Sequence, residues 1–139
     1  MRIVLDTNVV LSALLWRGTP YRLLEAIRNR AEARLFSSLA LLDELAEVLT
    51  RPSATKRLSG IGKTARDVLA DYVEAVEVVE PEHVPRVVPN DADDDQVIAA
   101  AIAANADWIV SGDADLLSMG SYQGIPIITA AQAVQQIAR

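Results

Sequence analysis

The sequence predicts an α/β domain in which helices cover both faces of a mostly parallel sheet of four to five strands, a three-layer α/β/α arrangement. Short apolar segments rich in Val and Ile alternate along the chain with segments of helical periodicity. The apolar segments are continuous rather than alternating, which is typical of strands buried on both faces. The length of 139 residues fits one domain over residues 1–139 built around a single core.

Five segments are expected to form strands. They are residues 2–5, 35–37, 77–79, 108–110 and 125–128. Asp6, Thr7 and Asn8 follow the first strand, and residues 111–115 (Ser-Gly-Asp-Ala-Asp) follow the fourth. Polar residues at the carboxyl ends of parallel strands lie where α/β sheets bind ligands. Pro126 indicates an edge position for the last strand, because proline has no N–H for a neighbouring strand.

The helices are expected between these strands. They are predicted over residues 9–16, 19–30, 39–49, 64–76, 96–104 and 130–138. Thr19-Pro20, Ser38, Thr64 and Thr129 have the residue types that begin helices. Residues 51–66 hold five basic side chains and two glycines, which favours a basic loop or a short helical pair. Residues 81–89 form a proline-punctuated connection in which His83 is expected to be exposed.

An acidic stretch comes directly before the helix expected over residues 96–104. Residues 91–95 read Asp-Ala-Asp-Asp-Asp, so four carboxylates share five positions. Two carboxylates ~5 Å apart repel by ~3 kcal/mol at an effective dielectric constant of ~20. A helix N-terminus can stabilise one or two of them. Further aspartates follow two strands, so the sequence favours a bound cation as well.

The composition restricts the chemistry that the chain can carry. The sequence has no cysteine, which excludes disulfides, thiolate zinc sites and cysteine nucleophiles, and its single histidine cannot build an imidazole site. A metal would therefore be held by oxygen ligands, which favours Mg²⁺ or Mn²⁺. The apolar runs are too short to span a membrane, and we expect a soluble, cytoplasmic protein.

The charge is unevenly distributed. The net charge is −6, yet residues 1–66 carry eleven Lys and Arg against six Asp and Glu, and residues 67–139 carry two against thirteen. A basic half beside an acidic centre suits a protein that holds an anionic polymer and cuts it with metals. Two solvated surfaces of opposite sign would give the same pattern. Trp16 and Trp108 are expected to pack in the core, although Trp16, beside Arg17, could also stack on a base.

Helical rotation distinguishes the acidic residues of two helices. On the helix over residues 39–49, Glu44 lies at the border of the buried stripe, whereas Asp43 and Glu47 lie outside it. On the helix that follows the acidic stretch, Asp94 lies in the middle of the buried arc and Asp95 at its edge. Asp6, Glu44, Asp94 and Asp113 are therefore the four candidate metal-binding acids. They are the parts needed for metal-assisted phosphodiester hydrolysis.

These residues together resemble the PIN-domain family. The resemblance rests on Asp6-Thr7-Asn8 after the opening strand, an acid on the helix after the second strand, Asp94 before an Ile-Ala-Ala run, and the Ser-Gly-Asp-Ala-Asp of residues 111–115. The most similar subgroup contains the VapC-type toxins of toxin–antitoxin modules. The resemblance covers nearly the whole chain. It implies a PIN-like fold, a Mg²⁺- or Mn²⁺-dependent ribonuclease, an RNA substrate, a cognate antitoxin and a homodimer or higher oligomer.

The resemblance also implies a role for each residue at the site. Asp6, Glu44, Asp94 and Asp113 would be catalytic, metal-binding acids. Three further residues would have supporting roles: Asn8 beside Asp6 or a water molecule, Ser111 beside Asp113, and Asp115 as a secondary ligand or hydrogen-bond partner. Ser111 stands where the family often has threonine. Asp95 is an alternative to Asp94 as the third metal-binding acid.

Other classes of protein fit the sequence less well. A receiver-type phosphoacceptor domain needs an acidic pair after its first strand and a lysine after its fifth, yet no lysine follows Lys63. A haloacid-dehalogenase-type phosphatase needs a second aspartate where this chain has Asn8. The alternative that stays open is a catalytically weak PIN-like module that binds RNA or a protein.

Overall fold

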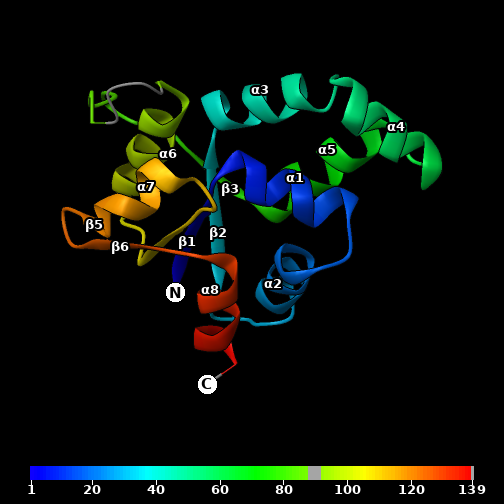
Figure 1. Ribbon diagram of the computed structural model, residues 1–139. Helices are drawn as coiled ribbons and strands as arrows, with labels where there is room; N and C mark the ends of the chain where they lie inside the picture. The colour runs from blue at the N-terminus through cyan, green and yellow to red at the C-terminus, as the bar shows by residue number, and fades with distance from the viewer. Residues whose placement is uncertain (88–91, 139) are drawn as a thin grey trace.

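The computed structural model describes residues 1–87 and 92–138 (Figure 1). Over these residues the chain forms one six-stranded sheet in the order β3-β2-β1-β4-β6-β5. The strands are β1 (Arg2–Leu5), β2 (Arg34–Ser38), β3 (Glu77–Val79), β4 (Trp108–Val110), β5 (Ser121–Tyr122) and β6 (Ile125–Ile128). Every pairing is parallel except that of β5 with β6. The predicted, mostly parallel α/β sheet is thereby confirmed.

Eight helices accompany this sheet in the described part of the chain. They are α1 (Thr7–Leu15), α2 (Thr19–Arg28), α3 (Leu39–Val48), α4 (Pro52–Gly60), α5 (Ala65–Ala75), α6 (Ala92–Ala103), α7 (Ala114–Met119) and α8 (Ala130–Ile137). None of these helices combines the length and the apolar character needed to cross a membrane. Three of the four predicted caps are present: Ser38 accepts from the Leu41 N–H, and Thr64 and Thr129 each form a capping box. The cap predicted at Thr19 is wrong, because Thr19 is the first residue of α2 and Gly18, which has no side chain to accept a hydrogen bond, is the N-cap.

The two faces of the sheet carry separate apolar cores. Ile3 and Leu5 of β1 pack on one face with buried residues of α1, α2, α4, α5 and α8. Val4, between them in the strand, points to the opposite face and packs with α6 and α7. Figure 1 shows α6 and α7 on one side of the strands and α1 and α2 on the other. The predicted three-layer arrangement is therefore confirmed.

The sheet differs from the prediction at its C-terminal side. It has six strands rather than four to five, because the two-residue β5 pairs with β6 and covers its outer edge. The expectation that residues 125–128 form an edge strand is therefore wrong. Pro126 is tolerated because it lies opposite Ser121 of β5, while Ile127 and Ile128 make the pairing with β4. Residues 52–60, expected to be irregular or part of a short helical pair, form the regular helix α4.

Candidate functional site

The carboxyl ends of β1 and β4 lie side by side. Leu5 is the register partner of Val110, and the Asp6 N–H donates to the Val110 carbonyl at 2.9 Å. The Ser111 N–H donates to the Ile128 carbonyl of β6 at 3.0 Å. The polar residues that follow these strands therefore gather at one edge of the sheet, as predicted from their positions in the sequence.

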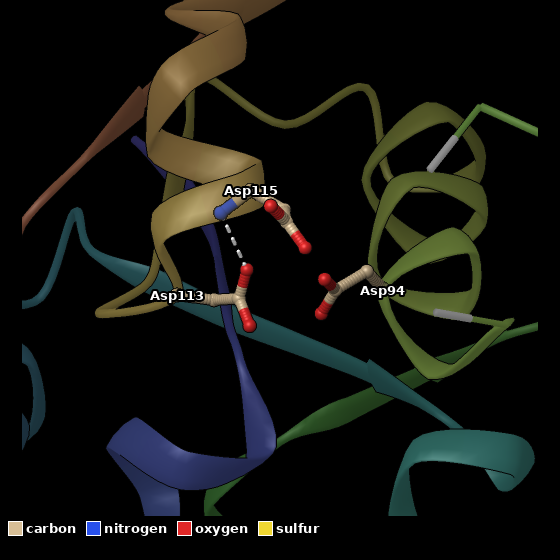
Figure 2. A group of neighbouring side chains, drawn as sticks. All are labelled: Asp94, Asp113 and Asp115. Atoms are coloured by element: carbon tan, nitrogen blue, oxygen red, sulfur yellow. Dashed lines mark hydrogen bonds between the residues drawn. The ribbon is translucent and has the colours of Figure 1, made fainter. Parts of the chain in front are cut away.

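Three aspartates meet near this edge, and we call Asp94, Asp113 and Asp115 the acidic group. One carboxylate oxygen of each lies within 4.8 Å of one oxygen of each of the others. Figure 2 shows Asp94 projecting from α6 toward Asp113 and Asp115 at the start of α7. Asp94 is buried, Asp113 is half-buried and Asp115 is exposed, so the group opens to solvent on the α7 side.

The start of α7 positions two of these carboxylates. Asp113 is the N-cap of this helix, and its Oδ1 accepts from the N–H groups of Asp115 and Leu116 at 2.8 and 3.2 Å. The cap fixes the Asp113 side chain and places Asp115 in the first turn (Figure 2). The sequence analysis did not predict this six-residue helix. The Asp-x-x-Leu pattern after a strand is the signal that could have revealed it.

Ser111 connects Asp6 to the acidic group. Its fully buried hydroxyl donates to Asp6 Oδ2 at 2.8 Å and accepts from the Asp113 N–H at 2.9 Å. The resemblance implied that Ser111 supports Asp113, and the structure shows that it bonds to Asp6 as well. One hydroxyl thus orients the residues that follow both β1 and β4.

Replacing Ser111 by alanine is expected to reduce the free energy of unfolding by about 1–3 kcal/mol, because the Asp6 carboxylate loses a hydrogen bond while it stays buried. Urea denaturation in EDTA measures this. Ser118→Ala is the matched control, since the Ser118 hydroxyl donates at 2.9 Å to the Asp115 carbonyl from an exposed position. Equal losses in the two variants would contradict the role given to Ser111.

Burial raises the pKa of Asp6 above its ordinary value, and the nearby Asp113 charge raises it further. The Ser111 hydrogen bond and the backbone N–H groups of Thr7 and Asn8 act in the opposite direction and offset part of the increase in pKa. The side chain of Asp6 is only 5% exposed, so its ionised form is costly when no cation is near.

This raised pKa predicts a pH dependence of stability. Below about pH 4 Asp6 is protonated in both the folded and the unfolded chain and contributes nothing. As pH rises from the pKa of the unfolded chain toward the raised pKa of the folded state, the unfolded chain releases this proton while the folded chain keeps it, so stability falls until the folded pKa is passed. Asp6→Asn is therefore expected to lose less stability between pH 4 and pH 7 than the native protein, measured as unfolding free energy in EDTA. Identical pH profiles would contradict this prediction.

The remaining residues predicted for the site differ in how exposed they are to solvent. Glu44 is half-buried on α3, and Asp43 and Glu47 are exposed, as the helical rotation predicted. Asp6 and Glu44 are not members of the acidic group. Asn8 is exposed at the start of α1 and lines a cavity of about 490 Å³ together with Ser111 and Asp113.

The geometry separates Asp94 from its neighbour Asp95. The Asp95 Oδ1 accepts from the Val87 N–H at 2.9 Å, which ties the end of the preceding loop to α6. Asp94 instead belongs to the acidic group. This arrangement favours Asp94 as the third acid of the predicted set. Asp91, the first residue of the acidic stretch, lies outside the described residues.

Two expectations about isolated side chains have different outcomes. His83 is exposed, as predicted. Trp16 is not in the core: it is 42% exposed at the end of α1, so that expectation is wrong. Its indole ring instead lies under the Arg57 guanidinium of α4, 5.9 Å from the ring centroid. Trp108 is half-buried in β4.

The donor set of the acidic group fits a divalent cation bound by oxygen. Its oxygens all lie within 4.8 Å of one another, which is the same scale as the roughly 3–4 Å between the oxygen ligands of one Mg²⁺ ion. Carboxylates are also the ligand type that Mg²⁺ and Mn²⁺ prefer over softer donors. Asp113 of the group lines the cavity described above, so a phosphate in that cavity would lie beside this carboxylate.

The model of the PIN-domain family matches residues 2–115, which include β1, β4 and every acidic residue discussed above. The chain belongs to the PIN-domain family. Members of this family are nucleases, and PIN nucleases use divalent metals. All three aspartates of the acidic group therefore lie within the part of this PIN domain that the family model matches. No curated protein sequence matches the chain.

A solved structure confirms the fold of this PIN domain. The chain is similar to one in the crystal structure of VapBC2 from Rickettsia felis bound to a DNA fragment from their promoter. The TM-score is 0.62, and the match covers 93% of this chain and 98% of that chain at 16% sequence identity. The match therefore extends beyond residue 115, where the match of the family model ends.

Proposed function

We propose that this PIN domain is a Mg²⁺- or Mn²⁺-dependent endoribonuclease that hydrolyses phosphodiester bonds. The observation that carries the proposal is the acidic group at the carboxyl edge of the sheet in a chain of a nuclease family. Three convergent carboxylates repel one another, so an arrangement that keeps them together favours a cation between them.

The proposed metal ligands are Asp94, Asp113 and Asp115, together with Asp6 and Glu44. A bound divalent cation would lower the pKa of a water molecule and neutralise charge on the phosphate. Asp6 and Asp113 are held in place by Ser111, and Asp113 is held further by the cap of α7. The cavity lined by Asn8, Ser111 and Asp113 would receive the scissile phosphate.

We further propose that the protein is the toxin of a type II toxin–antitoxin module in the cytoplasm. It would bind a cognate antitoxin and form a homodimer or higher oligomer. The similar solved structure is of VapBC2. Its match over nearly the full length of both chains supports an antitoxin partner for this protein as well.

Cleavage of a mixed RNA pool by the purified protein tests the proposed function. We expect cutting with Mn²⁺, no cutting in EDTA, and loss of cutting in Asp6→Asn, because that change removes an acid from the proposed ligand set. Equal cutting in all samples would reveal a contaminating nuclease. Intact RNA in every sample, with Mn²⁺ bound to the protein, would contradict a general ribonuclease and favour a PIN-like module that only binds its partner.

A further inference from the structure

Trp16 and Arg17, between α1 and α2, each belong to an arginine–aromatic pair that the proposed cleavage chemistry does not use, with Arg57 of α4 and Tyr21 of α2 as the partners. Arg57 lies over Trp16, and the Arg17 guanidinium lies 4.4 Å from the centroid of the Tyr21 ring. Significant pairs of this kind occur roughly once per 70–80 residues. Four such contacts occur among the described residues, two on Phe36 and two around the adjacent residues 16 and 17, so the junction of α1 and α2 is locally enriched in them.

Both pairs are held by hydrogen bonds. The Arg57 Nε donates to the Leu15 carbonyl at 2.7 Å, and the Arg17 Nη1 donates to the Tyr21 hydroxyl at 3.0 Å. The Trp16 N–H donates to the Ser12 carbonyl at 3.0 Å, which continues the hydrogen bonding of α1 by one residue. The rings are thus fixed in place, and Trp16 stays accessible at 42% exposure.

This surface lies at the C-terminal end of α1, the helix that begins beside the proposed active site. Asn8 and Ser12 lie four residues apart on one face of α1, and Trp16, four residues further on, is the C-cap of this helix. Asn8 and Ser12 line the cavity that reaches Ser111 and Asp113, and Pro20, next to Tyr21, lines its other side. The nine residues of α1 span roughly 14 Å, a distance that a few nucleotides of a single strand cover.

We propose that Trp16 and Tyr21, with Arg57 and Arg17 on their rings, form a platform on which unpaired bases of single-stranded RNA stack a few nucleotides from the bond held at the acidic group. This inference rests on the proposed ribonuclease function. Aromatic faces accept any base, and the adjacent cations attract the phosphates. The basic half of the chain adds exposed Arg22, Lys56 and Lys63 nearby in sequence. These charges favour RNA over a protein partner.

The emission of Trp16 reports base stacking directly. In a Trp108→Phe background Trp16 is the remaining tryptophan. With EDTA present to stop cleavage, a 12-nucleotide oligouridylate is expected to quench this emission saturably, while heparin, an anion without bases, and an RNA duplex are not. Quenching by heparin or the duplex as strong as that by the oligouridylate, or no quenching by RNA, would overturn the proposal.

Binding by otherwise native chains gives a second test. Trp16→Ala is expected to weaken oligouridylate binding, measured by fluorescence anisotropy in EDTA, by about 10-fold, within the range for loss of one stacked base. Trp16→Phe should retain most of the affinity. The control Val73→Ala truncates a comparably exposed apolar residue (43%) on α5 and should change nothing. Affinity in Trp16→Ala within two-fold of the native value would overturn the proposal.

These outcomes are separate from those of the cleavage assay. RNA that binds through Trp16 without Mn²⁺-dependent cutting would contradict the proposed ribonuclease and leave the platform standing. Mn²⁺-dependent cutting with unchanged RNA binding in Trp16→Ala would contradict the platform and leave the ribonuclease standing.

Discussion

Asp113→Asn and Asp94→Asn are each expected to lower the rate of RNA cleavage at saturating Mn²⁺ by about 10²- to 10³-fold, because metal binding supplies several kcal/mol of transition-state stabilisation. Each change removes a negative charge from the acidic group and leaves the side-chain shape nearly unchanged. In Asp113→Asn the remaining Oδ1 can still cap α7, so the helix that positions Asp115 should persist. Initial rates on one defined RNA substrate measure the effect.

Asp95→Asn is the matched control for Asp94→Asn. Both replace a buried aspartate in the first turn of α6. Asparagine keeps an oxygen that can accept from the Val87 N–H, as Asp95 Oδ1 does. We expect cleavage within a few-fold of the native rate. A loss in Asp95→Asn as large as in Asp94→Asn would contradict the assignment of the third acid.

Mn²⁺ is expected to raise the melting temperature by about 10 °C when its concentration is about 100 times the dissociation constant, because binding to the folded state alone then adds ~2.7 kcal/mol. The cation would also relieve the repulsion among Asp94, Asp113 and Asp115. Thermal unfolding with increasing Mn²⁺, followed by circular dichroism, gives this shift.

The same Mn²⁺ titration in Asp113→Asn separates the stabilisation by bound Mn²⁺ from the relief of repulsion among the carboxylates. The metal-free melting temperature should increase, since one of three mutually repelling charges is gone, and the response to Mn²⁺ should be mostly lost. Glu82→Gln, at an exposed position, is the matched removal of one negative charge and should keep the native response. A response to Mn²⁺ in Asp113→Asn equal to that of the native protein would argue against a cation at the acidic group.

The layers of the fold were predictable because each rests on many residues. The apolar runs of β1, β2, β4 and β6, the proline in the first turn of α2 and the capped starts of α3, α5 and α8 are local signals that agree with the tertiary structure. Two elements were missed. β5 has two residues and α7 has six, so neither shows a period, and each depends on partners elsewhere in the fold.

The candidate site, like the fold, was predictable where the signal is local and was missed where it depends on distant parts of the chain. Asp6, Ser111 and Asp113 were identified because the ends of neighbouring parallel strands meet at one edge. Asp115 was assigned a supporting role because its place in the acidic group depends on the turn of α7. The exposure of Trp16 was missed because its partner Arg57 is 41 residues further along the chain, beyond any local pattern.

Anomalous scattering from a crystal grown with Mn²⁺ tests the central claim most directly. We predict a manganese peak among the carboxylates of Asp94, Asp113 and Asp115, within bonding distance of at least two of them (Figure 2). A fully occupied peak elsewhere with none at the acidic group, or no peak at millimolar Mn²⁺, would contradict the account.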